Sequence, residues 1–114
     1  MPLFRLFLLV CLVVLAGYTA VTISNHGWTL FQVFFGDMAL MGWPGQFNLD
    51  FMMMLALSAT WTAWRNRFSS AGLALAMLAF FFGTSFLATY LLILTGRSKG
   101  DMKLVLLGEG RASA

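Results

Sequence analysis

The stretch Trp43-Pro44-Gly45-Gln46-Phe47-Asn48-Leu49-Asp50 marks the point where an irregular segment becomes a long apolar helix. Pro44 and the glycine after it are typical of a turn that stops a preceding helix. The side chains of Asn48 and Asp50 can accept hydrogen bonds from the free backbone N–H groups at a helix start. We therefore expect the chain to enter the membrane here and to cross it from about residue 47 to about residue 64.

The composition of the whole chain indicates a membrane protein. Its 114 residues are 61% hydrophobic and only 10% charged, and the mean hydropathy is +0.87. A soluble domain of this size needs far more charge on its surface. An apolar run of about 20 residues, at ~1.5 Å per residue, crosses a hydrocarbon core of ~30 Å. We therefore expect one integral membrane domain, 1–114, with no room for a separate soluble domain.

Apolar runs on both sides of the opening stretch predict the other elements. Trp28, Phe31 and Phe35 follow helical spacing in a segment too short to span, which is typical of a helix lying in the interface or re-entering the protein. The expected fold class is all-α, with three transmembrane helices and an interfacial or re-entrant helix between the first and the second. The expected segments are a first span at about 6–23, the interfacial helix at about 28–41, the second span at about 47–64, the third span at about 71–95 and a tail at 96–114.

The first apolar run has a competing interpretation as a cleaved signal peptide. Arg5 would be its basic start, residues 6–15 its apolar core, and cleavage would follow Ala16. The apolar character continues past that point to Ile23, which favours a retained span.

The charged residues flank the predicted spans. The formal net charge is +3, and seven basic residues spread along the chain form no patch, so we expect no nucleic-acid partner. The first loop, 24–46, contains no Lys or Arg, whereas Arg65 and Arg67 form a short basic turn. Short loops follow the positive-inside rule, which favours a cytoplasmic N-terminus and a tail on the outside. We expect a multi-pass protein of a bacterial inner membrane, with the lipid bilayer as its first partner.

Most of the polar side chains without an assigned role fall on one face of the predicted bilayer. Asp50 lies about one turn inside the second span, where a charge is costly unless it has a partner. One interpretation is a transport or ligand-binding site in which a His–Asp pair does acid–base work. The other is a helix start beside an ordinary solvated loop. The candidate ligand-binding residues are Asp50, His26, Asp37, Gln46, Asn48 and Trp43.

The sequence predicts neither a metal site nor a cofactor. Cys11 is the single cysteine and His26 the single histidine, which excludes an internal disulfide and a haem held by two histidines of one chain. Met38, Met41 and the run 52–54 could offer soft ligands to Cu(I). Consecutive methionines on a helix point in different directions, so we favour packing as their role.

Small residues at a spacing of four predict close helix contacts. Three such motifs are present: Ala16-x-x-x-Ala20, Ala59-x-x-x-Ala63 and Gly72-x-x-x-Ala76. Each presents a face on which two helices can approach closely. Three helices enclose a small interior, so we expect a homo-oligomer or a larger membrane-protein partner.

Three stretches carry a resemblance to known proteins. The run 43–50, the segment Trp61-Thr62-Ala63-Trp64-Arg65 and the run 83–90 resemble small bacterial membrane proteins of uncharacterised function. The resemblance covers residues 28–97 and implies three spans, an Asp at the start of the second and a glycine within the third, but no reaction. The size is also similar to that of small multidrug transporters, which have four spans and an acidic residue inside the first. The first span here has no acid, which departs from that pattern.

No catalytic constellation is visible, which favours a non-enzymatic membrane protein acting as an accessory or assembly subunit of a membrane complex. The alternative is a small transporter or hydrophobic-ligand-binding membrane protein that uses Asp50 and the first-loop polar residues. A third hypothesis, an enzyme acting on a lipid or isoprenoid, depends only on His26 and Asp50.

Overall fold

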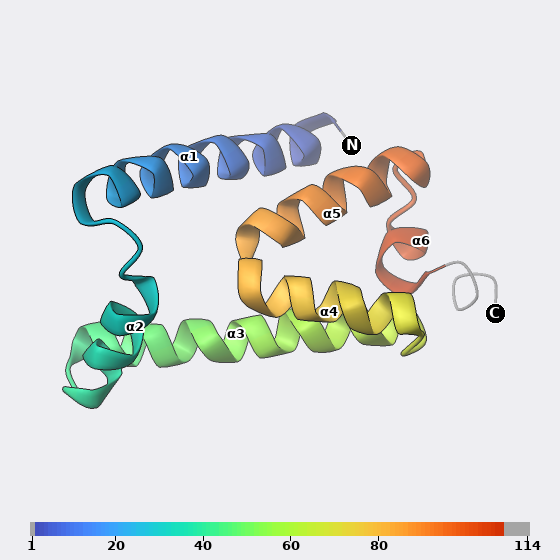
Figure 1. Cartoon of the computed structure of the whole chain (residues 1–114). Coiled ribbons are helices and arrows are strands. Elements are labelled where there is room, and N and C mark those ends of the chain that lie inside the picture. Colours follow the sequence, from blue (N-terminus) through green and yellow to red (C-terminus); the bar gives the residue numbers. More distant parts are fainter. Residues whose placement is uncertain (1, 109–114) are drawn as a thin grey trace.

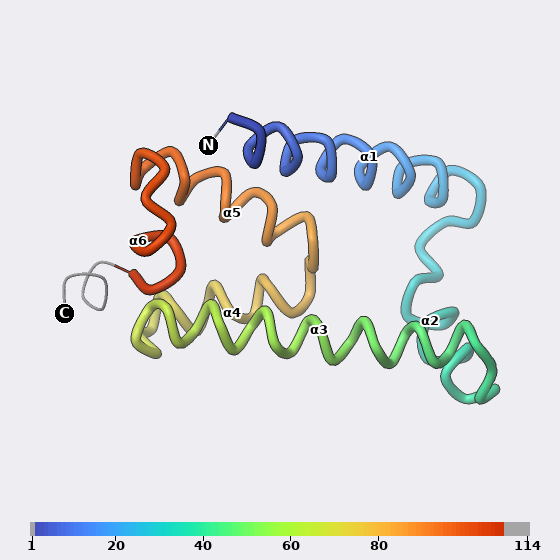
Figure 2. Tube along the Cα trace, turned by 180° about the vertical axis from the view of Figure 1, so that it is seen from behind, coloured from blue at the N-terminus to red at the C-terminus, as the bar shows by residue number. Residues whose placement is uncertain are grey.

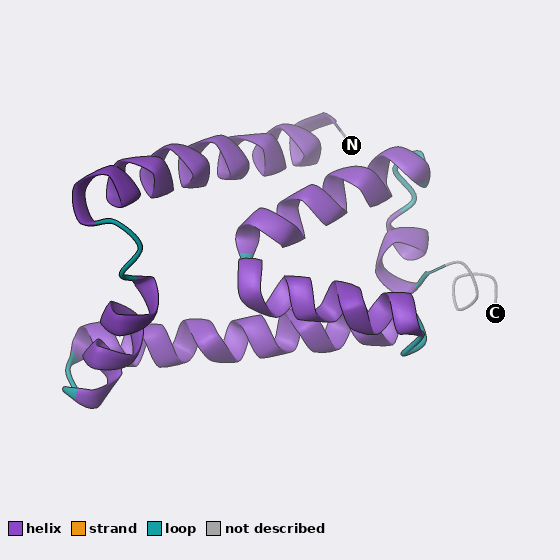
Figure 3. Cartoon of the chain, in the orientation of Figure 1, coloured by secondary structure: helices purple, strands orange, loops and turns teal. Residues whose placement is uncertain are grey.

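The protein is all-helical, as expected from its sequence. The structure is a computed structural model that describes residues 2–108, and within that range it contains helices and short connections with no strand (Figure 3). The helices are α1 (Pro2–His26), α2 (Leu30–Ala39), α3 (Trp43–Arg65), α4 (Ser70–Phe82), α5 (Thr84–Arg97) and α6 (Met102–Leu107).

Two long helices, α1 and α3, set the length of the molecule (Figure 1). They have 25 and 23 residues, or about 37 Å and 34 Å at ~1.5 Å per residue. The shorter helices α4 and α5 lie between them: α4 packs on α3, and α5 packs on α1. Figure 2 shows the same arrangement from behind, with α2 at one end of the molecule and α6 at the other.

The region expected to be a third span, 71–95, is not one continuous helix, so the prediction of a single helix here is wrong. Residues 71–95 are divided between α4, which runs back along α3, and α5, which returns toward the end from which α4 came (Figure 1). The break is at Gly83, whose φ of 57° and ψ of −129° are accessible to glycine but strained for other residues. With 13 and 14 residues, each arm is about 20 Å long, too short to cross a ~30 Å core alone.

The opening stretch begins a helix earlier than expected. Helix α3 starts at Trp43 with Pro44 in its first turn, where a missing backbone N–H costs nothing. Neither Asn48 nor Asp50 caps it: no side chain forms a cap hydrogen bond at this end, and the Nδ2 of Asn48 donates to the carbonyl of Phe34 instead (3.1 Å). The predicted capping role of these two residues is therefore wrong.

Helix α2 packs against the first turns of α3, and the predicted helix at residues 28–41 is confirmed over Leu30–Ala39. The two helices approach most closely at Gly45, which is buried. A Cβ atom at this position would lie 2.8 Å from the Cα of Met38. Gly45 is thus a close-approach residue inside α3 and not part of a turn.

The small core lies where α3, α5 and α6 meet. Its buried residues are Tyr90, Leu94 and Val105, with partly buried Trp61 and Leu91 packed against them. Val105 is fully buried, so the short α6 is an integral part of the fold. This helix, Met102–Leu107, lies in the segment that the sequence predicted only as a tail.

Among the described residues, α1 is the one helix with both the length and the composition to cross a membrane; a signal sequence near the N-terminus meets the same criteria. Three spans were expected from the sequence, but within residues 2–108 only α1 meets both the length criterion and the composition criterion for a span. Most apolar side chains of α1 are exposed, among them Leu3, Val13 and Tyr18.

Candidate functional site

The polar residues predicted to form a ligand site are spread over the corner between α2 and α3. Trp43, Gln46 and Asp50 lie on the first two turns of α3 and are exposed. Asn48 is half-buried through its hydrogen bond to the Phe34 carbonyl, and Asp37 is half-buried on α2. No hydrogen bond or ion pair joins one of these side chains to another within the described part of the chain.

His26, the sixth predicted residue, lies at the end of α1 and is exposed. It borders a groove of about 530 Å³ whose other walls include Tyr18, Thr22 and Trp28. Neither Asp37 nor Asp50 lines this groove. The arrangement therefore offers no His–Asp pair for acid–base chemistry, and residues 2–108 contain no group of three His, Cys, Asp or Glu side chains that could hold a metal ion.

The opposite end of the molecule gathers its positive charge. Arg5 is near the start of α1, Arg65 ends α3, Arg97 ends α5, and Lys103 is in α6; these helix ends lie together in Figure 1. Arg67 and Lys99 are in the connections beside them. We call this the basic end. It holds all six Lys and Arg residues of the described range, and Asp101 is the one described acid near them.

Arg65 joins α3 to the end of α6. Its Nε and Nη2 atoms donate to the carbonyls of Val105 and Leu104, the latter at 3.2 Å. The indole N–H of Trp61 donates to the next carbonyl, that of Leu106, at 3.1 Å. Three successive carbonyls at the C-terminal end of α6 thus accept from one turn of α3, and that of Leu104 also accepts from the backbone N–H of Gly108 (3.0 Å).

Tyr90 of α5 completes this junction. Its hydroxyl accepts hydrogen bonds from Nη1 of Arg65 (3.4 Å) and from Nδ2 of Asn66 (2.8 Å). The Arg65 guanidinium carbon also lies 5.8 Å from the centre of the Tyr90 ring, a cation–π distance. Arg65 is therefore held in one orientation by two other helices.

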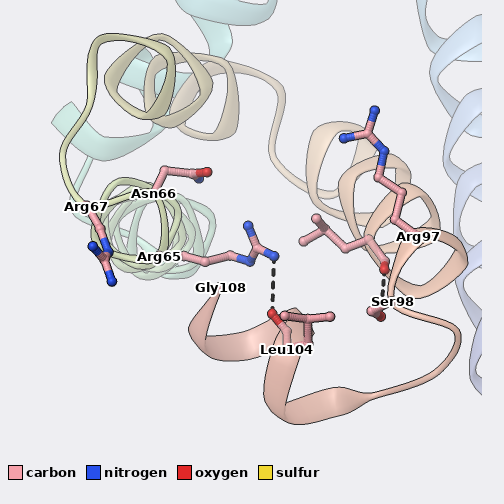
Figure 4. Close-up of a pocket in the computed structure, with 8 residues that line it drawn as sticks. Arg65, Asn66, Arg67, Arg97, Ser98, Leu104 and Gly108 are labelled. Carbon is pink, nitrogen blue, oxygen red and sulfur yellow. Dashed lines mark hydrogen bonds between the residues drawn. The ribbon is translucent and has the colours of Figure 1, made fainter. Parts of the chain in front are cut away.

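A pocket of about 300 Å³ opens beside this junction, between the ends of α3 and α5. The described residues that line it are Arg65, Asn66, Arg67, Arg97, Ser98, Leu94, Leu104 and Gly108, and none of them is an acid. Figure 4 shows Arg65 and Asn66 extending from α3 toward α5, with Arg97 across the space from them and Arg67 on the outer side of the α3 end. The chemistry of this pocket is that of an anion site.

Arg5 has a structural role at the same end. Its Nη1 atom donates to the carbonyl of Leu92 and to the hydroxyl of Thr95, each at 2.8 Å. Thr95 is buried. The single charge of α1 is thus used to join α1 to α5.

Sequence reasoning identified Arg65 and Arg67 as a charged turn but did not find the pocket. Its other walls come from Arg97 and from α6, which are distant in sequence. One signal was present: Asp101 precedes the apolar run as a helix N-cap, accepting from the backbone N–H of Lys103 and Leu104, and Gly108 follows it. That pattern predicts a helix at 102–107, but not where the helix packs.

The fold and its charge distribution thus define a class: a small all-helical protein with one strongly apolar helix and a single basic end. No family model, curated protein or solved structure shows a significant match to this chain.

Proposed function

We propose that this chain is a small non-enzymatic integral membrane protein that acts as an accessory or assembly subunit of a larger membrane complex. In this proposal α1 and α3 cross the bilayer, α4 and α5 form a hairpin that re-enters it from the basic end, and α2 lies in the interface. The positive-inside rule then directs the basic end to the cytoplasm of a bacterial inner membrane.

The bonds between α1 and the rest of the chain support its role as a retained span. Arg5 is hydrogen-bonded to α5, and Leu8 is buried, with 5% of its surface exposed. A signal peptide is removed from the mature protein and has no need of such contacts.

The observation that carries the subunit proposal is an unused small-residue face on α1. Of the three predicted motifs, one is on α3 and one on α4, two helices that pack together, and Ala63 and Gly72 of these motifs are buried. The third, Ala16 and Ala20 with Gly17 between them, is exposed, and a Cβ atom at Gly17 would meet nothing within 4 Å. Such faces let helices approach closely in lipid, so an uncovered one is suited to a helix of a second subunit.

Filling this face should separate the subunits. We expect the double variant Ala16→Leu/Ala20→Leu to lose its oligomer or its co-purifying partner by several-fold in a mild detergent, because the longer side chains keep a second helix away. Chemical cross-linking in membranes, followed by purification in mild detergent, measures this loss.

The matched control is Ala56→Leu/Ala74→Leu, which adds the same volume at exposed positions of α3 and α4. It should leave the association intact. Wild-type protein that always runs alone as a monomer, or equal behaviour of the two double variants, contradicts the proposal.

A further inference from the structure

We infer that the pocket at the basic end binds the phosphate group of an anionic phospholipid. The groups that would recognise it are the side chains of Arg65, Asn66, Arg67, Arg97 and Ser98. The inference rests on the membrane placement proposed above, but not on the subunit contact at α1.

Within residues 2–108, no acidic side chain lines the pocket to neutralise its positive charge. Three guanidinium groups line it, and their hydrogen bonds within the described chain go to neutral carbonyl and hydroxyl oxygens. The carboxylate of Asp101 does not line the pocket and instead accepts from the first N–H groups of α6. A bound anion would therefore supply a counter-charge that residues 2–108 do not place in this pocket.

Arg65 is already oriented for such a ligand. Arginine has five N–H donors, and three atoms of Arg65 each donate one hydrogen bond to α6 or to Tyr90. Two N–H groups, one on each terminal nitrogen, are left over. Since the guanidinium is fixed by its other bonds, binding loses little side-chain freedom.

Arg97 and Arg67 supply further N–H donors to the pocket. Neither side chain forms a hydrogen bond or an ion pair with the part of the chain that the structure describes. Planar guanidinium groups match the oxygens of a phosphate in pairs, with bonds stronger than those between neutral groups. Asn66 and Ser98 are the neutral polar groups beside them.

The surroundings favour a phospholipid over a free phosphate ion. Leu94 and Leu104 line the pocket beside the arginines, and Phe68, directly after Arg67, is 56% exposed. Trp61 and Tyr90 lie in the adjoining junction, and aromatic residues of this kind mark the headgroup level of a bilayer. An amphiphile with an anionic headgroup matches both parts of this surface, and the cytoplasmic leaflet supplies such lipids.

The test compares lipid binding by three proteins: wild type, Arg97→Gln and Lys99→Gln. Arg97 lines the pocket, whereas Lys99 is an exposed cation two residues further on that does not line it. Each variant loses one positive charge, so a difference between them reports on the pocket and not on net charge. Native mass spectrometry in detergent, titrated separately with phosphatidylglycerol, phosphatidylcholine and inorganic phosphate, measures binding. We expect wild type to prefer phosphatidylglycerol, Arg97→Gln to bind it about tenfold more weakly, and Lys99→Gln to change affinity by less than about threefold.

Three results would overturn the inference: no preference for phosphatidylglycerol over phosphatidylcholine, equal losses in both variants, or full occupation of the site by inorganic phosphate alone. The second result would mean attraction to net charge only, and the third would make the ligand a soluble phosphate. Thermal unfolding of each variant in detergent verifies its fold, and Arg67→Gln provides a second pocket variant. A wild-type protein that binds the lipid as expected but shows no association through α1 would count against the subunit proposal alone.

Discussion

Gly108 determines whether the end of α6 can lie against α3. Its φ of 84° and ψ of 165° belong to a region that is almost restricted to glycine, and a Cβ atom there would lie 2.8 Å from the carbonyl oxygen of Arg65. We expect Gly108→Ala to destabilise the docked α6 by about 1–3 kcal/mol, through backbone strain and this close contact. Hydrogen exchange should then be faster at the amide of Val105.

Gly42→Ala is the matched control for that substitution. Gly42 has a φ of −99°, and its added Cβ would make an ordinary contact of 3.7 Å with Pro44. The rate of hydrogen exchange at the Val105 amide should be the same in Gly42→Ala as in the wild-type protein. Unchanged protection of Val105 in Gly108→Ala would mean that the docking of α6 does not depend on this residue.

At the residue scale, the sequence located charges better than it located their partners. Asp50 and His26 were placed on one face of the membrane by counting residues, yet they are exposed at different places and share no hydrogen bond. Arg65 was predicted as part of a short basic turn, but its hydrogen-bond partners are 25 to 40 residues further along the chain. Such pairings depend on tertiary packing, which local patterns do not encode.

At the element scale, Gly83 separates a hairpin from a straight helix. A Cβ atom there would lie 3.2 Å from side-chain atoms of Leu55 and Phe51, in addition to the strain of a positive φ. We expect Gly83→Ala to lower the free energy of unfolding by about 1–3 kcal/mol. Thermal unfolding in detergent, followed by near-ultraviolet circular dichroism, measures this change.

Gly36→Ala is the control for that experiment, because Gly36 is inside α2 and its Cβ would meet nothing within 4 Å. Alanine is favoured over glycine in a helix interior by about 0.5–1 kcal/mol, so this variant should be equally or more stable. A Gly83→Ala protein as stable as Gly36→Ala would contradict the structural role of the break.

The hairpin was missed because hydropathy carries no information on chain direction. Residues 71–95 contain no charge. The mean hydropathy of such a segment is the same whether it crosses the membrane once as a single helix or enters and returns as a hairpin. The start of α4 was predictable from local chemistry: the hydroxyl of Ser69 accepts from the N–H of Gly72 at 3.0 Å, as expected for a capping serine. The close contact of α3 with α4 was also predictable from the small residues on each.

At the scale of the whole molecule, the break at Gly83 changes which chain ends lie together. A straight third helix would carry Arg97 and Lys99 to the end opposite Arg65, and the basic residues would be divided between the two ends. In the structure these residues are at one end, while Asp37 and Asp50 are on α2 and the beginning of α3 at the other (Figure 1). A membrane protein with this distribution has a single orientation that satisfies the positive-inside rule.

This topology can be tested with single cysteines in a Cys11→Ser background. Phe68, Lys99 and Asn25 are exposed, so each can be replaced by cysteine and labelled in intact cells or in inverted vesicles with a membrane-impermeant maleimide. We expect Phe68→Cys and Lys99→Cys to react from the cytoplasmic side and Asn25→Cys from the outside. Three full spans would instead place residue 99 on the side of residue 25. Labelling of Lys99→Cys and Asn25→Cys from the same side would therefore rule out the re-entrant hairpin and the single basic end with it.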